Sequence, residues 1–273
     1  MRRPVPLNAL IGGSLIGLLV LTAAVALVWT PYDPLAVNLR ARMVPPGAAY
    51  PLGTDEFGRD VLSRLMAGAA SSTIVSLATV AFAVVAGGTL GLVAGFLRGW
   101  TDRALMAVND ALLAFPGILL ALGFLVVFGA SKWGIVIALG LAYAPSVARV
   151  VRGTVLSIRE REYVEASRVI GNPEHVTLWR HVAPNCIAPV AVLATSMFGW
   201  VLLSESALSF LGLGVPPPAP TWGNMLAGSR PFMESAMWLG IAPGLCIALS
   251  LLGINLLGDW LRDRLDPRMA VHA

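Results

Sequence analysis

The charged stretch REREYVEASRVIGNPEHVTLWRHVAP, residues 159–184, stands between two long apolar runs of the chain. We call residues 159–184 the elbow. Its first part is rich in helix-forming residues and places Tyr163, Ala166 and Ile170 on one helical face. This spacing predicts a short amphipathic helix.

The second half of the elbow carries signals for a corner and a new helix. Gly171 fits the left-handed residue that ends a helix. Asn172 followed by Pro173 is typical of the N-cap and first position of a second helix. Pro184 marks the return to apolar sequence. The elbow is therefore predicted to be helix, tight corner, helix.

The composition around the elbow indicates a membrane protein. Of 273 residues, 57% are hydrophobic and 12% are charged, against roughly 25% charged in soluble domains. The mean hydropathy is +0.77. A net charge of +4 is too small for a nucleic-acid footprint. Cys186 and Cys246 lie in apolar runs, so we expect neither a disulfide framework nor a metal site.

Uncharged runs long enough to cross a bilayer predict an all-α polytopic protein with six transmembrane helices. The first run follows Arg2 and Arg3 but is too long for the apolar part of a signal peptide. No internal repeat or linker is visible, so residues 1–273 are predicted to form a single transmembrane domain. The predicted spans are approximately residues 7–29, 70–97, 104–130, 133–151, 183–205 and 235–258.

The distribution of arginine predicts the orientation. Six spans place both termini on one side, and the larger share of the arginines lies on that side when it is cytoplasmic. Both termini and the elbow are then cytoplasmic.

Two uses of the elbow follow from its residues alone. A partner could hold it in a groove, with Glu165 accepting from an arginine or lysine, Ala166 and Ser167 allowing close approach, and Gly171 setting the angle. Alternatively, the helix could lie on anionic lipid with its arginines toward the headgroups.

The spacing Glu165-Ala-Ser, Gly171, Pro184 resembles the EAA loop of binding-protein-dependent ABC importer permeases. Ser167 stands where a second alanine is usual, and His181 and Ala183 also depart from the pattern. Further stretches resemble the dipeptide, oligopeptide and nickel branch of that family: Leu52–Arg64, Asp110–Pro116, Leu208–Gly214 leading to Trp222–Met225, and Asn255–Pro267.

The resemblance implies a type I importer permease fold with a cytoplasmic coupling helix, in a bacterial inner membrane. It implies a second homologous permease subunit, two cytoplasmic ABC ATPase subunits and an extracytoplasmic substrate-binding protein as partners, besides lipid. The implied cargo is di- and oligopeptides, or alternatively nickel, a metal chelate or glutathione. The residues implied in ATPase coupling are Tyr163, Glu165, Ala166, Ser167, Gly171, Asn172 and Pro184.

The sequence lacks the features of a catalyst. No GxxxxGK[ST] motif occurs, and the single lysine, Lys132, lies in Gly-Ala-Ser-Lys-Trp, so ATP and Mg are expected in the partner ATPases. Intramembrane hydrolysis is not expected, because HExxH and GxSxG are absent and every histidine falls in a predicted cytoplasmic segment. A transporter driven by an ion gradient is a less favoured alternative, because such chains are usually longer and carry inverted repeats.

Polar residues near the spans are candidates for the pathway or for structure. Asp110, followed by Pro116 in the same motif, could line the pathway, but we favour a brace with Arg103 or an arginine of a neighbouring span. Glu205, beside Ser206, could face the pathway mouth or the binding protein, or form a solvated cap.

The segment after the first span contains Asp55, Glu56 and Asp60. The order of an EF-hand loop is absent, so we predict capping and an Asp60–Arg64 pair rather than a calcium site. Near the membrane surface, Trp222 and Trp238 fit an outer aromatic belt, and Trp100 and Trp260 fit an inner one.

Overall fold

The structure is a computed structural model, and it describes residues 6–265. These residues form helices joined by turns, with one isolated bridge between Thr54 and Asp60, which confirms the predicted all-α class. The helices are α1 Leu7–Ala26, α2 Val61–Leu97, α3 Gly99–Leu113, α4 Gly117–Phe128, α5 Lys132–Ile158, α6 Glu162–Val169, α7 Glu174–Thr177, α8 Ile187–Phe210, α9 Trp222–Ser229 and α10 Trp238–Leu265.

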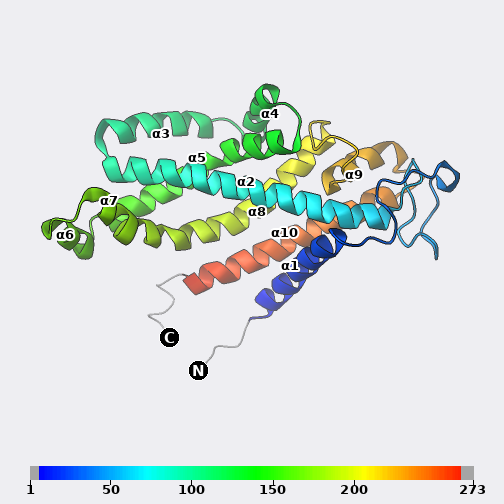
Figure 1. Ribbon diagram of the computed structural model, residues 1–273, viewed down its shortest axis with the longest axis horizontal. Helices are drawn as coiled ribbons and strands as arrows, with labels where there is room; N and C mark the ends of the chain where they lie inside the picture. Colours follow the sequence, from blue (N-terminus) through cyan, green and yellow to red (C-terminus); the bar gives the residue numbers. More distant parts are fainter. Residues whose placement is uncertain (1–5, 266–273) are drawn as a thin grey trace.

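Figure 1 shows an elongated bundle with two unlike ends. The elbow end carries α6 and α7. The loop end carries residues 27–60, α9 and the turns around it. The long helices run between these ends, and α1 begins and α10 ends toward the elbow end. The segment between α8 and α10 contains α9 and a 3-10 turn at Arg230–Phe232, and its proline-rich part before Thr221 is not helical.

Among the described residues, five helical runs are long and apolar enough to cross a membrane: α1, α2, α5, the run Glu174–Phe210 that includes α8, and α10. A sixth passage exists if α3 and α4 together count as one. The region of the predicted span over residues 104–130 is bent, because α3 and α4 meet at an angle of 101°. Pro116 lies at this break, where its ring and its missing N–H prevent α3 from continuing.

Several helices extend beyond the predicted spans. α2 begins at Val61 rather than near residue 70, and α5 continues to Ile158 rather than ending near residue 151. The predicted limits stood where charged residues interrupt the apolar runs. In the structure these charges are paired: Arg64 contacts Asp55, and Arg152 contacts Asp102. Paired charges do not end a helix, so the apolar runs underestimate helix length.

The closest helix packing joins α2 to α5 along a row of glycines. Gly91 of α2 lies so near α5 that a Cβ added to it would stand 2.5 Å from the carbonyl oxygen of Ala148. Further along, a Cβ on Gly95 would stand 2.9 Å from Cβ of Val155. Lipid gives no hydrophobic drive for helices to associate, so close backbone approach at small residues is a main source of packing energy.

Candidate functional site

The corner of the elbow has the predicted left-handed glycine. Gly171 has φ +88°, which confirms its role in ending α6. Its N–H donates to the carbonyl of Arg168 at 2.9 Å, and the N–H of Asn172 donates to that of Ser167 at 3.1 Å. The last turn of α6 is thereby closed, and the chain reverses into α7.

The second helix begins differently from the prediction. α7 starts at Glu174 with Pro173 as its N-cap residue, so Asn172 is not the cap. Instead the Asn172 amide donates to Oγ of Ser167 at 3.0 Å. The same Oγ lies 3.1 Å from Oγ1 of Thr177 in α7. Ser167 therefore joins the two halves of the elbow, and Asn172 at the corner is a further partner of Ser167.

The two faces of α6 have different surroundings. Ser167 is only 4% exposed and lies on the inner face with Val164, so its side chain packs against the elbow itself. The helical period places these two residues together, three positions apart. The outer face is open: Tyr163 is 46% exposed, Ile170 is 80% exposed, and Glu165 and Ala166 are also exposed. The exposed surface of α6 therefore presents apolar side chains beside two carboxylates, Glu162 and Glu165.

The elbow returns to the bundle through irregular helical turns. A π-helical turn at Leu178–Val182 and a 3-10 turn at Ala183–Cys186 precede α8, and Pro184 lies in the second. Pro184 therefore stands at the re-entry that the sequence predicts.

Asp110 pairs with an arginine of a neighbouring helix. Its Oδ1 accepts from NH2 of Arg149 in α5 at 2.7 Å, and both side chains are 61% exposed. The favoured brace therefore has Arg149, and not Arg103, as its partner.

Glu205 is not a solvated cap, and it does not face a pathway mouth within this chain. The residue is completely buried, and its Oε1 accepts from Oγ of Ser209 at 2.9 Å. The neighbouring Ser206 is also buried and donates to the carbonyl of Leu202. The physical reason is the packing of α9 over this end of α8, where a Cβ on Gly223 would stand 2.7 Å from Cα of Ser206.

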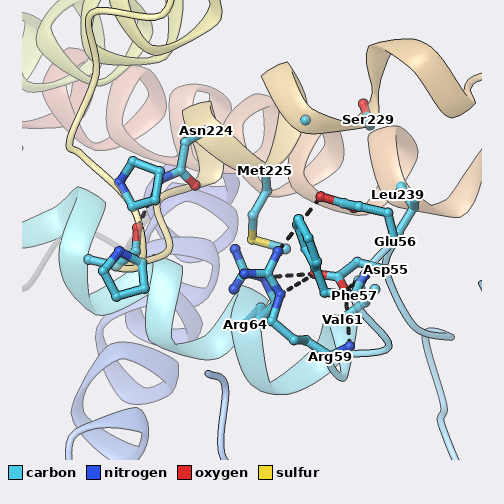
Figure 2. Close-up of a pocket in the computed structure, with 14 residues that line it drawn as sticks. Asp55, Glu56, Phe57, Arg59, Val61, Arg64, Asn224, Met225, Ser229 and Leu239 are labelled. Atoms are coloured by element: carbon cyan, nitrogen blue, oxygen red, sulfur yellow. Dashed lines mark hydrogen bonds and ion pairs between the residues drawn. The ribbon is translucent and has the colours of Figure 1, made fainter. Parts of the chain in front are cut away.

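A pocket of about 380 Å³ opens at the loop end between the segment before α2, α9 and the start of α10 (Figure 2). Its charged side chains pair with one another. Arg59 reaches Asp55 at 2.6 Å and Glu56 at 3.7 Å, and Arg64 reaches Asp55 at 3.5 Å. The two carboxylates and two guanidinium groups that line the pocket therefore balance in charge.

Asp60 caps α2, as predicted, but its predicted pairing with Arg64 is wrong. Oδ2 of Asp60 accepts from the N–H of Ser63 at 2.8 Å, and this geometry turns the carboxylate to the helix end instead of toward Arg64. No group of three or more acidic, histidine or cysteine side chains within residues 6–265 is placed to hold a metal ion.

Trp222 does not belong to an aromatic belt. It is 3% exposed, and its Nε1 donates to the carbonyl of Leu65 in α2 at 2.9 Å. Gly68 makes room for its ring, since a Cβ there would stand 3.0 Å from Cδ1 of Trp222. Trp238 is half-buried, with Nε1 3.5 Å from the carbonyl oxygen of Thr54.

Two arginines that connect helices at the elbow end were not predicted from the sequence. Arg159 donates to carbonyls at the end of α2, and Arg152 pairs with Asp102 of α3. In the sequence both arginines are positive charges on one side of the membrane, and Arg152 is expected to reach from the end of a span to the membrane surface. Their partners lie far away in the chain, so no local spacing could have revealed them.

Comparison with known proteins identifies related chains along almost the whole length. The family described as "Binding-protein-dependent transport system inner membrane component" matches residues 87–271. A putative peptide transport system permease protein of Brucella suis biovar 1 is 42% identical over 261 residues, covering 95% of this chain and 88% of the relative.

Two further relatives carry more specific names. The dipeptide transport system permease protein DppC of Alkalihalophilus pseudofirmus is 40% identical over 261 residues, covering 96% of this chain and 86% of the relative. The glutathione transport system permease protein GsiD of Pectobacterium atrosepticum is 40% identical over 224 residues, covering 82% of this chain and 74% of the relative.

Proposed function

Because this chain belongs to the family of inner membrane components of binding-protein-dependent transport systems, we propose that it is the permease subunit of an ATP-driven importer of di- and oligopeptides. It forms half of the translocation pathway. The observation that carries this proposal is the elbow, whose outer face exposes Tyr163, Glu165 and Ile170 at one end of a membrane bundle.

The elbow is the part of the chain suited to receive a mechanical input. Its two helices are joined internally through Ser167, so a partner that holds the outer face of α6 moves the elbow as a unit. Glu165 accepts a hydrogen bond from a basic side chain of the partner, and the exposed apolar side chains supply contact area. Such contacts shift the permease between two states only if they differ between those states.

The elbow end faces the cytoplasm in this proposal, and both termini lie on that side. The concentration of arginine there supports this orientation, as does the direction of α1 and α10 in Figure 1. Two ATPase subunits, which bind ATP and Mg, contact the elbows of this subunit and of a second homologous permease. An extracytoplasmic binding protein delivers cargo at the loop end.

A second cargo is supported by one observation. Some relatives are named as glutathione transport permeases, and glutathione is itself a small peptide. The proposal therefore covers short peptides in general, with dipeptides as the first choice because several relatives are named for them.

The test is uptake by the whole importer, purified with its partners and reconstituted in liposomes with ATP on the elbow side. Labelled dipeptide and glutathione are offered with the binding protein. We expect the wild-type importer to take up dipeptide only when ATP is present. We expect Glu165→Ala to lower the amount of dipeptide taken up per ATP by about tenfold, which is within the usual range of coupling effects. Asp259→Ala is the control, because Asp259 is an exposed carboxylate on α10, outside the elbow. Uptake driven by an ion gradient without ATP, or unchanged uptake by Glu165→Ala, would overturn the proposal.

A further inference from the structure

Arg159 connects the elbow to a helix that lies far from it in sequence. It follows the last residue of α5, and its NH1 donates to the carbonyls of Gly95 at 3.2 Å and Phe96 at 2.8 Å. Both carbonyls belong to the last turn of α2, where a helix leaves its C=O groups without intrahelical partners. Arg159 therefore caps α2 from another segment of the chain, and its charge is favourable at the negative end of the helix.

Two weaker contacts surround this cap. Arg98, at the end of α2, reaches Glu160 of the elbow at 3.0 Å. Arg168 of α6 lies over the ring of Phe96, with its guanidinium carbon 5.9 Å from the ring centre. The Arg98–Glu160 pair is exposed and contributes little by itself. Both contacts nevertheless join the elbow to the same end of α2.

The surroundings of Arg159 make its hydrogen bonds important. Burial lowers the pKa of Arg159, and the nearby charges of Arg98 and Arg168 lower it further. An arginine keeps its charge in proteins, so this guanidinium needs the two carbonyl oxygens of α2 as partners. A substitution that removes the donors leaves both carbonyls unpaired in a half-buried place.

The glycine packing extends this connection along the membrane. α2 and α5 are in direct contact at Gly91 and Gly95, up to the turn from which Arg159 projects. On its other side, the elbow joins α8 through the irregular turns at Leu178–Cys186. A displacement of the elbow therefore reaches α8 along the continuous helical run Glu174–Phe210, and it reaches the end of α2 through the hydrogen bonds of Arg159.

We infer that Arg159 is a positioning residue that makes α2 move together with α5 when a partner displaces the elbow. This inference rests on the proposed function and adds the route by which motion leaves the elbow. α2 has 37 residues and spans roughly 55 Å at 1.5 Å per residue. Its far end lies at the loop-end pocket beside Asp55 and Arg64 (Figure 2). The helix capped by Arg159 thus connects the two ends of the subunit.

The first test uses the reconstituted whole importer and measures peptide uptake and ATP hydrolysis together. We expect Arg159→Gln to lower uptake per ATP by about tenfold while ATP hydrolysis persists, and Arg159→Lys to recover part of the loss, because an ammonium still donates to a carbonyl. Arg161→Gln is the matched control, because Arg161 is exposed and lies two positions away. Uptake per ATP equal to wild type in Arg159→Gln would overturn the inference.

The second test does not depend on the folding of an Arg159 variant. Spin labels are placed at Val169 of α6 and Leu97 of α2, both exposed, in a complex that is otherwise wild type. We expect their separation to stay constant between the nucleotide-free and ATP-bound complexes. A change of about 5 Å, the length of one helical turn, would show that the elbow moves without α2 and would overturn the inference. If the proposed function itself is wrong, the wild-type complex takes up peptide without ATP. That outcome differs from the two results that would overturn the role of Arg159.

Discussion

Asp102 and Arg152 form a two-pronged ion pair that joins the first turn of α3 to α5. Nε of Arg152 lies 2.5 Å from Oδ1 of Asp102, and NH2 lies 2.7 Å from Oδ2. The chain reaches this position through a tight reversal at Arg98 and Gly99, which have φ values of 57° and 64°. The pair therefore holds α3 against the same helix, α5, that carries the elbow.

Loss of the Asp102 carboxylate should destabilise the bundle. The two side chains are 14% and 32% exposed, so Asp102→Asn leaves Arg152 in a partly buried position without its charged partner. We expect a loss of roughly 2 kcal/mol, measured as a lower thermal unfolding temperature in detergent. Asp110→Asn is the control: its pair with Arg149 is 61% exposed on both sides and should contribute less than about 1 kcal/mol. Equal shifts for the two variants would contradict this prediction.

The glycine contact between α2 and α5 predicts opposite effects at two nearby positions. Gly91→Ala places its Cβ 2.5 Å from the carbonyl oxygen of Ala148, so the helices must separate, at a cost of about 1–3 kcal/mol. Gly88→Ala meets nothing within 4 Å and should raise stability slightly, since alanine favours helix over glycine. Thermal unfolding of the two variants checks the prediction. Equal or higher stability of Gly91→Ala would show that the two helices are not in backbone contact there.

Because Glu205 is buried, we predict that the volume of its side chain contributes more to the stability of the protein than its negative charge does. Within the described residues, Oε1 accepts from Ser209 and Oε2 has no hydrogen-bond partner. Glu205→Gln keeps the Ser209 bond and the volume, so we expect stability equal to or above that of the wild type. Glu205→Ala leaves a cavity beneath α9 and should cost roughly 2–4 kcal/mol. A large loss in Glu205→Gln, measured by thermal unfolding, would indicate that the carboxylate itself is required.

The helix–corner–helix form of the elbow could be predicted from the sequence, but the contacts between its side chains could not. Gly171 could be placed at a left-handed corner because few residues other than glycine adopt that conformation readily. The inner position of Ser167 was not predicted, because the partners that bury it, Asn172 and Thr177, become neighbours only after α7 folds back on α6. The predicted Asp60–Arg64 pair failed for a similar reason, because Asp55 is the nearer partner of Arg64 once the loop closes.

The amino-acid sequence alone determined that this protein is a helical membrane bundle with one charged elbow, because hydropathy and helix-breaking residues act over short distances along the chain. Tertiary structure decided which charges are paired and which polar groups are buried. Arg159 meets carbonyls 63 and 64 positions away, and Glu205 is covered by α9, a helix later in the chain. These contacts depend on how helices pack in space, and an ion pair or a hydrogen bond requires only that two groups meet, whatever their separation in sequence.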